Sequence, residues 1–429
     1  MKNKKNILDK LLFFLLVFLP IYKDSPLSAY FGAAGYTLVL PLTLIISALY
    51  IVLKKIKNTN IYLKYITNLG IWLGIVSVLG IIVCYILGYP LTYLGEFLPY
   101  KAIKVLLQYL AFPAYVMLLI NCLEKFGEEK LFKYMFFTMI ILTIIGLLER
   151  SQIPYAFEKI HFYGMFPYWR IRLLTKEASE TTTLVLIYCL MPIMYYLKSG
   201  KKVLVTISSV CLVFLIYITQ AKSLLLAIGI FVIIYIIYIL RKLTKRKLLL
   251  LLLLFFIFSI FIIYLLPKFG TMLKNDIDNF TSTATRSYTF FISVIIGTFF
   301  PFGVGGGAYL IVLKSYLSKY LTIFDYLPIE LNQKEIYTLI NSDSDVALTV
   351  KSGIMDYNVH WGIFGTICLM RCFIKLSKKY RKLREEHWEL ILSLFWTNII
   401  MLFLFCNFSF EFWIVFSYMA YCSERRKEN

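Results

Sequence analysis

Apolar runs of about 20 residues recur along the chain, and an α-helix of that length crosses a bilayer. Backbone polar groups find no water in lipid, so such runs predict helices. The mean hydropathy of the 429 residues is +0.76, which excludes an ordinary soluble domain. We therefore expect an all-α, polytopic integral membrane protein, a single membrane domain over residues 1–429, with about twelve transmembrane helices. The predicted spans are 7–22, 35–53, 65–87, 102–122, 131–148, 181–197, 203–218, 222–240, 248–266, 357–374, 388–405 and 409–422.

The formal net charge of +21 is compatible with nucleic-acid binding, but the positions of the charges indicate another cause. Lysine and arginine gather in every second connection when the predicted spans are threaded in order, which is the positive-inside pattern. We therefore expect no nucleic-acid partner, and we place both termini in the cytoplasm. The basic clusters lie at residues 2–5, 54–64, 198–202, 241–247, 375–384 and 425–427.

Two connections are long, residues 149–180 and 267–356, and this threading places both on the outer side. The second contains an apolar stretch at 287–300 that is short for a span and is ended by Pro301. We interpret it as a helix packed at the membrane interface, followed by a glycine-rich turn where the backbone approaches something closely. The turn contains Gly303, Gly305, Gly306 and Gly307. The chain shows no internal repeat, which weakens a transporter interpretation.

Arginine is scarce in the connections predicted to be outside. A guanidinium group matches phosphate oxygens with a planar fork, so Arg170, Arg172 and Arg286 predict an anion site. Lys222, at the outer start of span 222–240, is a further candidate cation. The alternative is that these residues anchor helix ends near lipid headgroups or extend outward from the membrane, and for Arg150 we favour the anchor.

A general base must accept a proton from a hydroxyl group, and several groups in the same connections can do so. The candidates are Glu177, His360 and the aspartates Asp343, Asp345 and Asp356, with Glu180 and His161 nearby. Solvated carboxylates and a structural histidine are the alternatives. The aromatic residues 162–169 can stack on sugars or form an interfacial belt. Cys368 and Cys372 have no histidine or carboxylate beside them, so we expect no metal site.

The motifs, in this order, resemble those of the bacterial O-antigen polymerase and O-antigen ligase superfamily, most closely its capsular and exopolysaccharide polymerases. Arg170, Glu177 and Ser179 match its arginine and Glu-Pro-Ser motif, with Ala178 in place of the proline. Ala221 and Lys222 stand where a Ser-Arg pair is usual. Further matches are Arg286, Pro301, Gly303, Gly305, Gly307, Gly362 and Gly365. Ligases carry a histidine about ten residues before the last glycine pair, and His360 lies closer, so the polymerases are the better match.

This resemblance implies a GT-C-like membrane glycosyltransferase in the bacterial cytoplasmic membrane, working on its outer face without a cofactor or metal. The donor and acceptor would be oligosaccharides linked to undecaprenyl pyrophosphate, and a chain-length regulator and a flippase would be partners. Arg170, Arg172, Lys222 and Arg286 would bind the pyrophosphate, with Gly303 and Gly305 beside it. Glu177, His360 or Asp356 would take the acceptor proton. A ligase of the same superfamily and a flippase for the lipid-linked sugar remain the alternatives.

Overall fold

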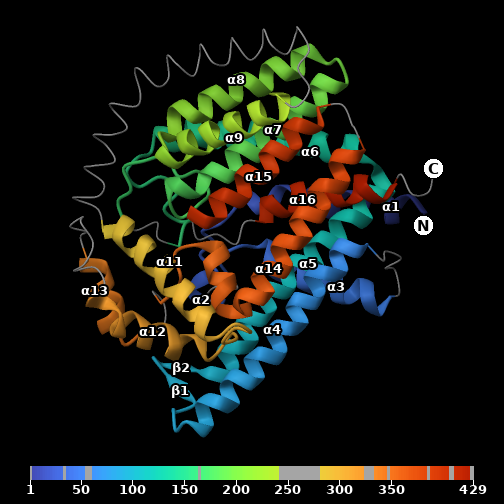
Figure 1. The fold of residues 1–429 in the computed structure, drawn as a ribbon. Helices are drawn as coiled ribbons and strands as arrows, with labels where there is room; N and C mark the ends of the chain where they lie inside the picture. Colours follow the sequence, from blue (N-terminus) through green and yellow to red (C-terminus); the bar gives the residue numbers. More distant parts are fainter. Residues whose placement is uncertain are drawn as a thin grey trace.

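The structure is a computed structural model that describes residues 2–31, 35–53, 60–162, 166–240, 281–322, 333–344, 348–383, 387–404 and 410–425. Helices dominate these residues (Figure 1). The first half contains α1 (Lys2–Phe18), η1 (Leu19–Ile21), α2 (Ser28–Phe31), α3 (Val39–Val52), α4 (Ile61–Ile86), β1 (Thr92–Tyr93), β2 (Glu96–Phe97), α5 (Leu98–Phe126), α6 (Glu128–Arg150), η3 (Ala178–Glu180), α7 (Thr181–Lys198) and α8 (Lys202–Thr219). The second half contains α9 (Lys222–Leu240), α11 (Thr281–Phe299), α12 (Tyr309–Lys319), α13 (Lys334–Asn341), α14 (Gly353–Lys382), α15 (Trp388–Leu404) and α16 (Phe410–Arg425).

The protein is an all-α, polytopic membrane protein, as its sequence predicts. Seven of the described helices are long and apolar enough to cross a membrane, and the shorter α3 and α15 are apolar too. Every predicted span coincides with a described helix except 248–266, which lies outside the described residues, as do Tyr163, Asp345 and residues 267–280. The hairpin of β1 and β2 was not predicted from the sequence.

The spans differ in how much of each is covered by protein. In the span that contains α7, 72% of the membrane-length apolar segment is buried inside the protein, and in α5 the share is 67%. In α8 and α9, both strongly apolar, only 28% of the corresponding segment is buried inside the described part of the protein. A helix that is apolar all round and uncovered by protein fits a lipid environment. Among the described residues, α5 and α7 are thus the most covered of these spans, and α8 and α9 are the least covered.

The glycine-rich turn after α11 packs against a kink in α14. Gly362 interrupts that helix with φ 72°, and Gly303 in the turn has φ 92°. A Cβ atom on Gly303 would lie 2.3 Å from the carbonyl oxygen of His360. The close approach expected at the turn is therefore an approach to another part of this protein. Figure 1 shows α11, α12 and α13 grouped at one corner, next to α14.

Helix α14 begins earlier than predicted, at Gly353 instead of residue 357. The sequence analysis treats Asp356 as part of the long connection, and the structure places it in the first turn of the helix. Polar residues lower the hydropathy of this turn, so the prediction missed it. Those polar residues, Asp356, Asn358 and His360, are all buried, which explains how a polar sequence can form the start of a helix here.

Candidate functional site

An ion pair joins the two ends of the chain inside the protein. Lys23 directly follows the first helices and Glu411 lies in the first turn of α16. The Lys23 Nζ atom is 2.6 Å from Glu411 Oε1, and both side chains are buried. Thr183 Oγ1 in α7 donates to the same carboxylate oxygen at 2.5 Å. This pair was not predicted from the sequence, although a carboxylate at the start of a predicted span is a signal for a special role.

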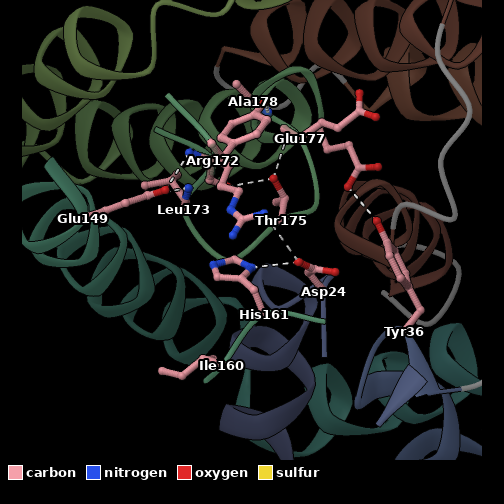
Figure 2. A network of polar contacts seen from close by, with 12 residues as sticks. Asp24, Tyr36, Glu149, Ile160, His161, Arg172, Leu173, Thr175, Glu177 and Ala178 are labelled. Carbon is pink, nitrogen blue, oxygen red and sulfur yellow. Dashed lines mark hydrogen bonds and ion pairs between the residues drawn. The ribbon is translucent and has the colours of Figure 1, made fainter. Parts of the chain in front are cut away.

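A second cluster of polar and charged side chains surrounds Asp24, the next residue (Figure 2). His161 Nδ1 lies 2.9 Å from Asp24 Oδ2, and Arg172 Nη1 lies 3.9 Å from the same oxygen. The guanidinium carbon of Arg172 lies 5.2 Å from the centre of the Tyr168 ring, within cation–π range. All three ionisable side chains are buried. Arg172, a predicted anion ligand, therefore already has a carboxylate partner within the protein.

Glu149, near the end of α6, holds the backbone of the same loop. Its carboxylate accepts the N–H groups of Arg172 at 2.9 Å and of Leu173 at 2.7 Å. Thr175 Oγ1 donates to the carbonyl groups of Arg172 and Glu177. The Lys23 N–H donates to the carbonyl of Leu174. Residues 172–177 are therefore held in place by both side chains and backbone.

Tyr168 links the network to the start of α7. The N–H group of Ala178 donates to its hydroxyl oxygen at 2.8 Å. Burial raises the pKa of the Tyr168 phenol, so the hydroxyl stays neutral at physiological pH. A neutral phenol can accept this N–H group and still present its ring to Arg172. The hydrogen bond to Tyr168 thus helps to fix the position of Ala178, the first residue of η3.

Glu177 belongs to the same loop, and unlike the buried residues of that loop its side chain is exposed. Ser179 Oγ lies 3.4 Å from its carboxylate, and Ser223 Oγ reaches the carbonyl of Ser179. Ser223 also shares a 2.7 Å hydrogen bond with Thr182. Lys222 is the neighbour of Ser223 and is half-buried. The structure therefore brings the segments of Glu177 and Lys222 together, as an anion site made from both would require.

Arg170 and Arg286 lie in other surroundings. Arg170 is exposed and lines a small hollow together with Arg150. Arg286 is half-buried in α11, and its Nη1 atom donates to the carbonyl of Leu404 at the end of α15, 3.4 Å away. Ser352 donates to the carbonyl of the adjacent Phe403 at 2.7 Å. Arg286 thus lies where α11, α14 and α15 meet, and Arg170 and Arg172 do not share one pocket.

Asp356 and His360 form a separate buried cluster. The hydroxyl of Tyr109 donates to Asp356 Oδ2 at 3.0 Å, and His360 Nε2 lies 3.7 Å from Asp356 Oδ1. His360 Nδ1 lies 3.2 Å from the carbonyl oxygen of Gly305. A Cβ atom on Gly305 would lie 2.4 Å from the Cα atom of Ser77 in α4. These contacts connect α14, the glycine-rich turn and α4.

An apolar pocket of about 470 Å³ opens beside the glycine-rich turn. Its walls come from α4, the turn and α12, and include Trp72, Gly80, Phe302, Val304, Ile311 and Tyr316. A pocket of this size and character fits a hydrocarbon chain or another apolar group. Among the described residues, no group of three or more His, Cys, Asp or Glu side chains could hold a metal ion.

The fold and these contacts define a class of protein: a polytopic all-α membrane protein with a buried network of ions at one end of its helices. No protein-family model matches the sequence. Part of the chain is similar to a curated protein of Klebsiella pneumoniae, "Uncharacterized 49.5 kDa protein in cps region". The two are 28% identical over 159 residues, which is 37% of this chain. The chain thus spans 36% of the relative's length.

Proposed function

We propose that the protein is a membrane glycosyltransferase that polymerises oligosaccharide units linked to undecaprenyl pyrophosphate into a surface polysaccharide. The observation that carries the proposal is the arrangement around the Arg172 network. Glu177, whose carboxylate is exposed, follows a loop that buried charged side chains hold in place. Ser223, the residue after Lys222, is hydrogen-bonded to the carbonyl of Ser179, two residues after Glu177. The similar protein from a cps region supports a role in capsular polysaccharide synthesis.

The reaction would transfer a glycan from one lipid carrier to another. A hydroxyl oxygen of the acceptor sugar attacks the anomeric carbon of the donor, and the bond from that carbon to the pyrophosphate oxygen breaks. Glu177 takes the hydroxyl proton, and the lipid pyrophosphate leaves with the bonding electrons. Cationic groups stabilise its developing charge, which lowers the barrier most when they are held in place beforehand.

The residues would divide this work according to their surroundings. Arg170 is exposed and Lys222 and Arg286 are half-buried, so all three can meet anionic groups of the donor. Arg172 is paired with Asp24 and would act as a positioning residue. Among the candidate bases, Glu177 is exposed, whereas Asp356 and His360 are buried and bonded to Tyr109 and Gly305. We therefore favour Glu177 as the base.

The apolar pocket next to Gly303 supports a lipid-linked substrate. Its walls are almost entirely apolar, and it lies against α4, a span of which 33% of the best-scoring window is covered by protein. A prenyl chain could reach such a pocket from the membrane without crossing water. Gly303 and Gly305 would then shape the wall next to the substrate, since they bring the turn close to α14 and α4.

The test is polymerisation by the purified protein. We would incubate it in nanodiscs with a synthetic repeat unit on undecaprenyl pyrophosphate and separate the products by gel electrophoresis. We expect a ladder of products in which successive bands differ by one repeat unit. Transfer of a single glycan only to an acceptor without a lipid pyrophosphate would support the ligase instead. Movement of the substrate across the bilayer with no new glycosidic bond would support the flippase.

A further inference from the structure

A small hollow of about 160 Å³ lies where three segments meet: the end of α6, residues 169–171 and the end of α8. The side chains of interest on its walls are Arg150, Trp169, Arg170, Tyr217 and Gln220. It differs in kind from the pocket beside the glycine-rich turn, because two arginines and a glutamine are among the residues that line it.

Arg150 and Arg170 are both exposed, and neither is within 4.0 Å of a carboxylate oxygen anywhere in the described parts of the chain. The Arg150 guanidinium carbon lies 5.7 Å from the centre of the Tyr217 ring. Arg172, two residues after Arg170, shows the contrast because it is paired with Asp24. Two exposed arginines without carboxylate partners beside one hollow are available to an anion there, with an attraction that salt weakens.

Two helices end at the hollow, and the charge at their ends affects how an anion can bind there. Arg150 is in the last turn of α6, and Gln220 ends α8 with φ 46° and ψ 29°, in the left-handed region. The carbonyl groups at both C-terminal ends carry partial negative charge and disfavour an anion on their own. An anion would therefore depend on both arginines, and the loss of both should remove its binding entirely.

Trp169 adds a flat face to the same hollow and is 75% exposed. An indole ring with this exposure can stack on the apolar face of a sugar ring. The hollow is small, about 160 Å³, and open to solvent, so one sugar ring or one phosphate can occupy it while the rest of a saccharide extends outward. Size, charge and the aromatic face together fit a single anionic unit attached to a saccharide.

We propose that this hollow binds one anionic group carried by the glycan substrate, held by Arg150 and Arg170 with Trp169 against the sugar. The group is either the carboxylate of an acidic sugar or a phosphate at the carrier end. This inference rests on the proposed function for the identity of the substrate. The binding of the anion itself can be measured without turnover.

The experiment is a calorimetric titration of the purified protein in nanodiscs with three probes. They are a disaccharide containing glucuronate, the same disaccharide with glucose in its place, and inorganic pyrophosphate. We expect one of the two anionic probes to bind at least tenfold more tightly than the neutral disaccharide. Arg150→Gln and Arg170→Gln should each weaken that binding about tenfold, the value of one charge-assisted hydrogen bond. The double variant should show no binding.

Arg371→Gln is the matched control, since Arg371 is an exposed arginine on α14 that does not line the hollow. It should bind like wild type. Preference for glucuronate identifies an acidic sugar as the source, and preference for pyrophosphate identifies the carrier. Equal binding of all three probes, or wild-type binding by the double variant, would overturn the inference. Anion binding that depends on both arginines in a protein that makes no ladder would uphold it and contradict only the proposed polymerase.

Discussion

The paired charged side chains at the two ends of the helical bundle differ in how exposed they are. At one end Lys125 pairs with Asp9 and Lys201 lies 3.8 Å from Glu129, and these side chains are 20–73% exposed. We call it the basic end. At the other, which we call the charged end, Lys23 with Glu411 and Asp24 with His161 are 0–4% exposed. Exposed pairs contribute about 0–1 kcal/mol, whereas breaking a buried pair costs about 3–5 kcal/mol.

The difference suggests different roles for the same residue types. The exposed lysines of the basic end suit contact with lipid headgroups. The charged end contains ions of both signs that hold one loop against α6, α7 and α16. Burying ions is costly, and an apolar core could replace them at lower cost. We infer that the charged end is preorganised for binding and chemistry.

The largest expected difference between the ends is their access from outside the cell. In a cysteine-free background, Glu158→Cys in the loop after α6 should react with an impermeant maleimide in intact spheroplasts. Lys201→Cys, before α8, should react only after lysis. Labelling measured by gel shift decides the orientation. The reverse pattern would contradict the placement of the charged end on the outer face.

The next effect is on stability. Glu411→Ala leaves Lys23 buried without its carboxylate and should reduce the free energy of unfolding by about 3–5 kcal/mol. Asp9→Ala removes the partner of Lys125 at the basic end and should cost about 0–1 kcal/mol. Thermal unfolding in detergent compares the two variants at matched protein concentration. Similar losses in both would mean that the ends do not differ as described.

A smaller effect is expected at the glycine-rich turn. Gly303→Ala combines a positive φ angle with a Cβ atom 2.3 Å from the His360 carbonyl oxygen, so a cost of about 2–4 kcal/mol is expected. Gly88→Ala is the control, because φ is 79° there and nothing lies within 4 Å. It should cost only about 1–2 kcal/mol. If Gly88→Ala were as damaging as Gly303→Ala in the same unfolding measurement, the tight contact with α14 would be disproved.

Much of the fold could be predicted because each span carries its own signal in its apolar residues. The start of α14 could not, since Asp356, Asn358 and His360 are helical only because neighbouring elements bury and bond them. The ion pair of Lys23 and Glu411 was equally hidden, because its partners are 388 positions apart. Composition and spacing identify charged residues but not their partners.

The candidate site also shows that the sequence does not reveal the partners of charged residues, even when these are neighbours in the chain. Arg170 and Arg172 are two positions apart, and the sequence analysis assigned both to one anion site. The structure assigns Arg172 to Asp24 and Arg170 to the hollow with Arg150, although only one residue separates them in the chain. The segments of Glu177 and Lys222, by contrast, lie together, since Ser223 Oγ reaches the carbonyl of Ser179. Closeness in the sequence therefore does not decide which charges share a pocket.

The most direct test of the central claim, that the charged end performs the glycosyl transfer, is the ladder assay on matched variants of the two ends. Glu177→Gln should leave the protein folded and donor binding intact, yet reduce chain growth about a hundredfold or more, because an amide cannot accept the acceptor proton. Lys201→Ala at the basic end should produce the wild-type ladder. A normal ladder from Glu177→Gln beside a lost ladder from Lys201→Ala would contradict the account.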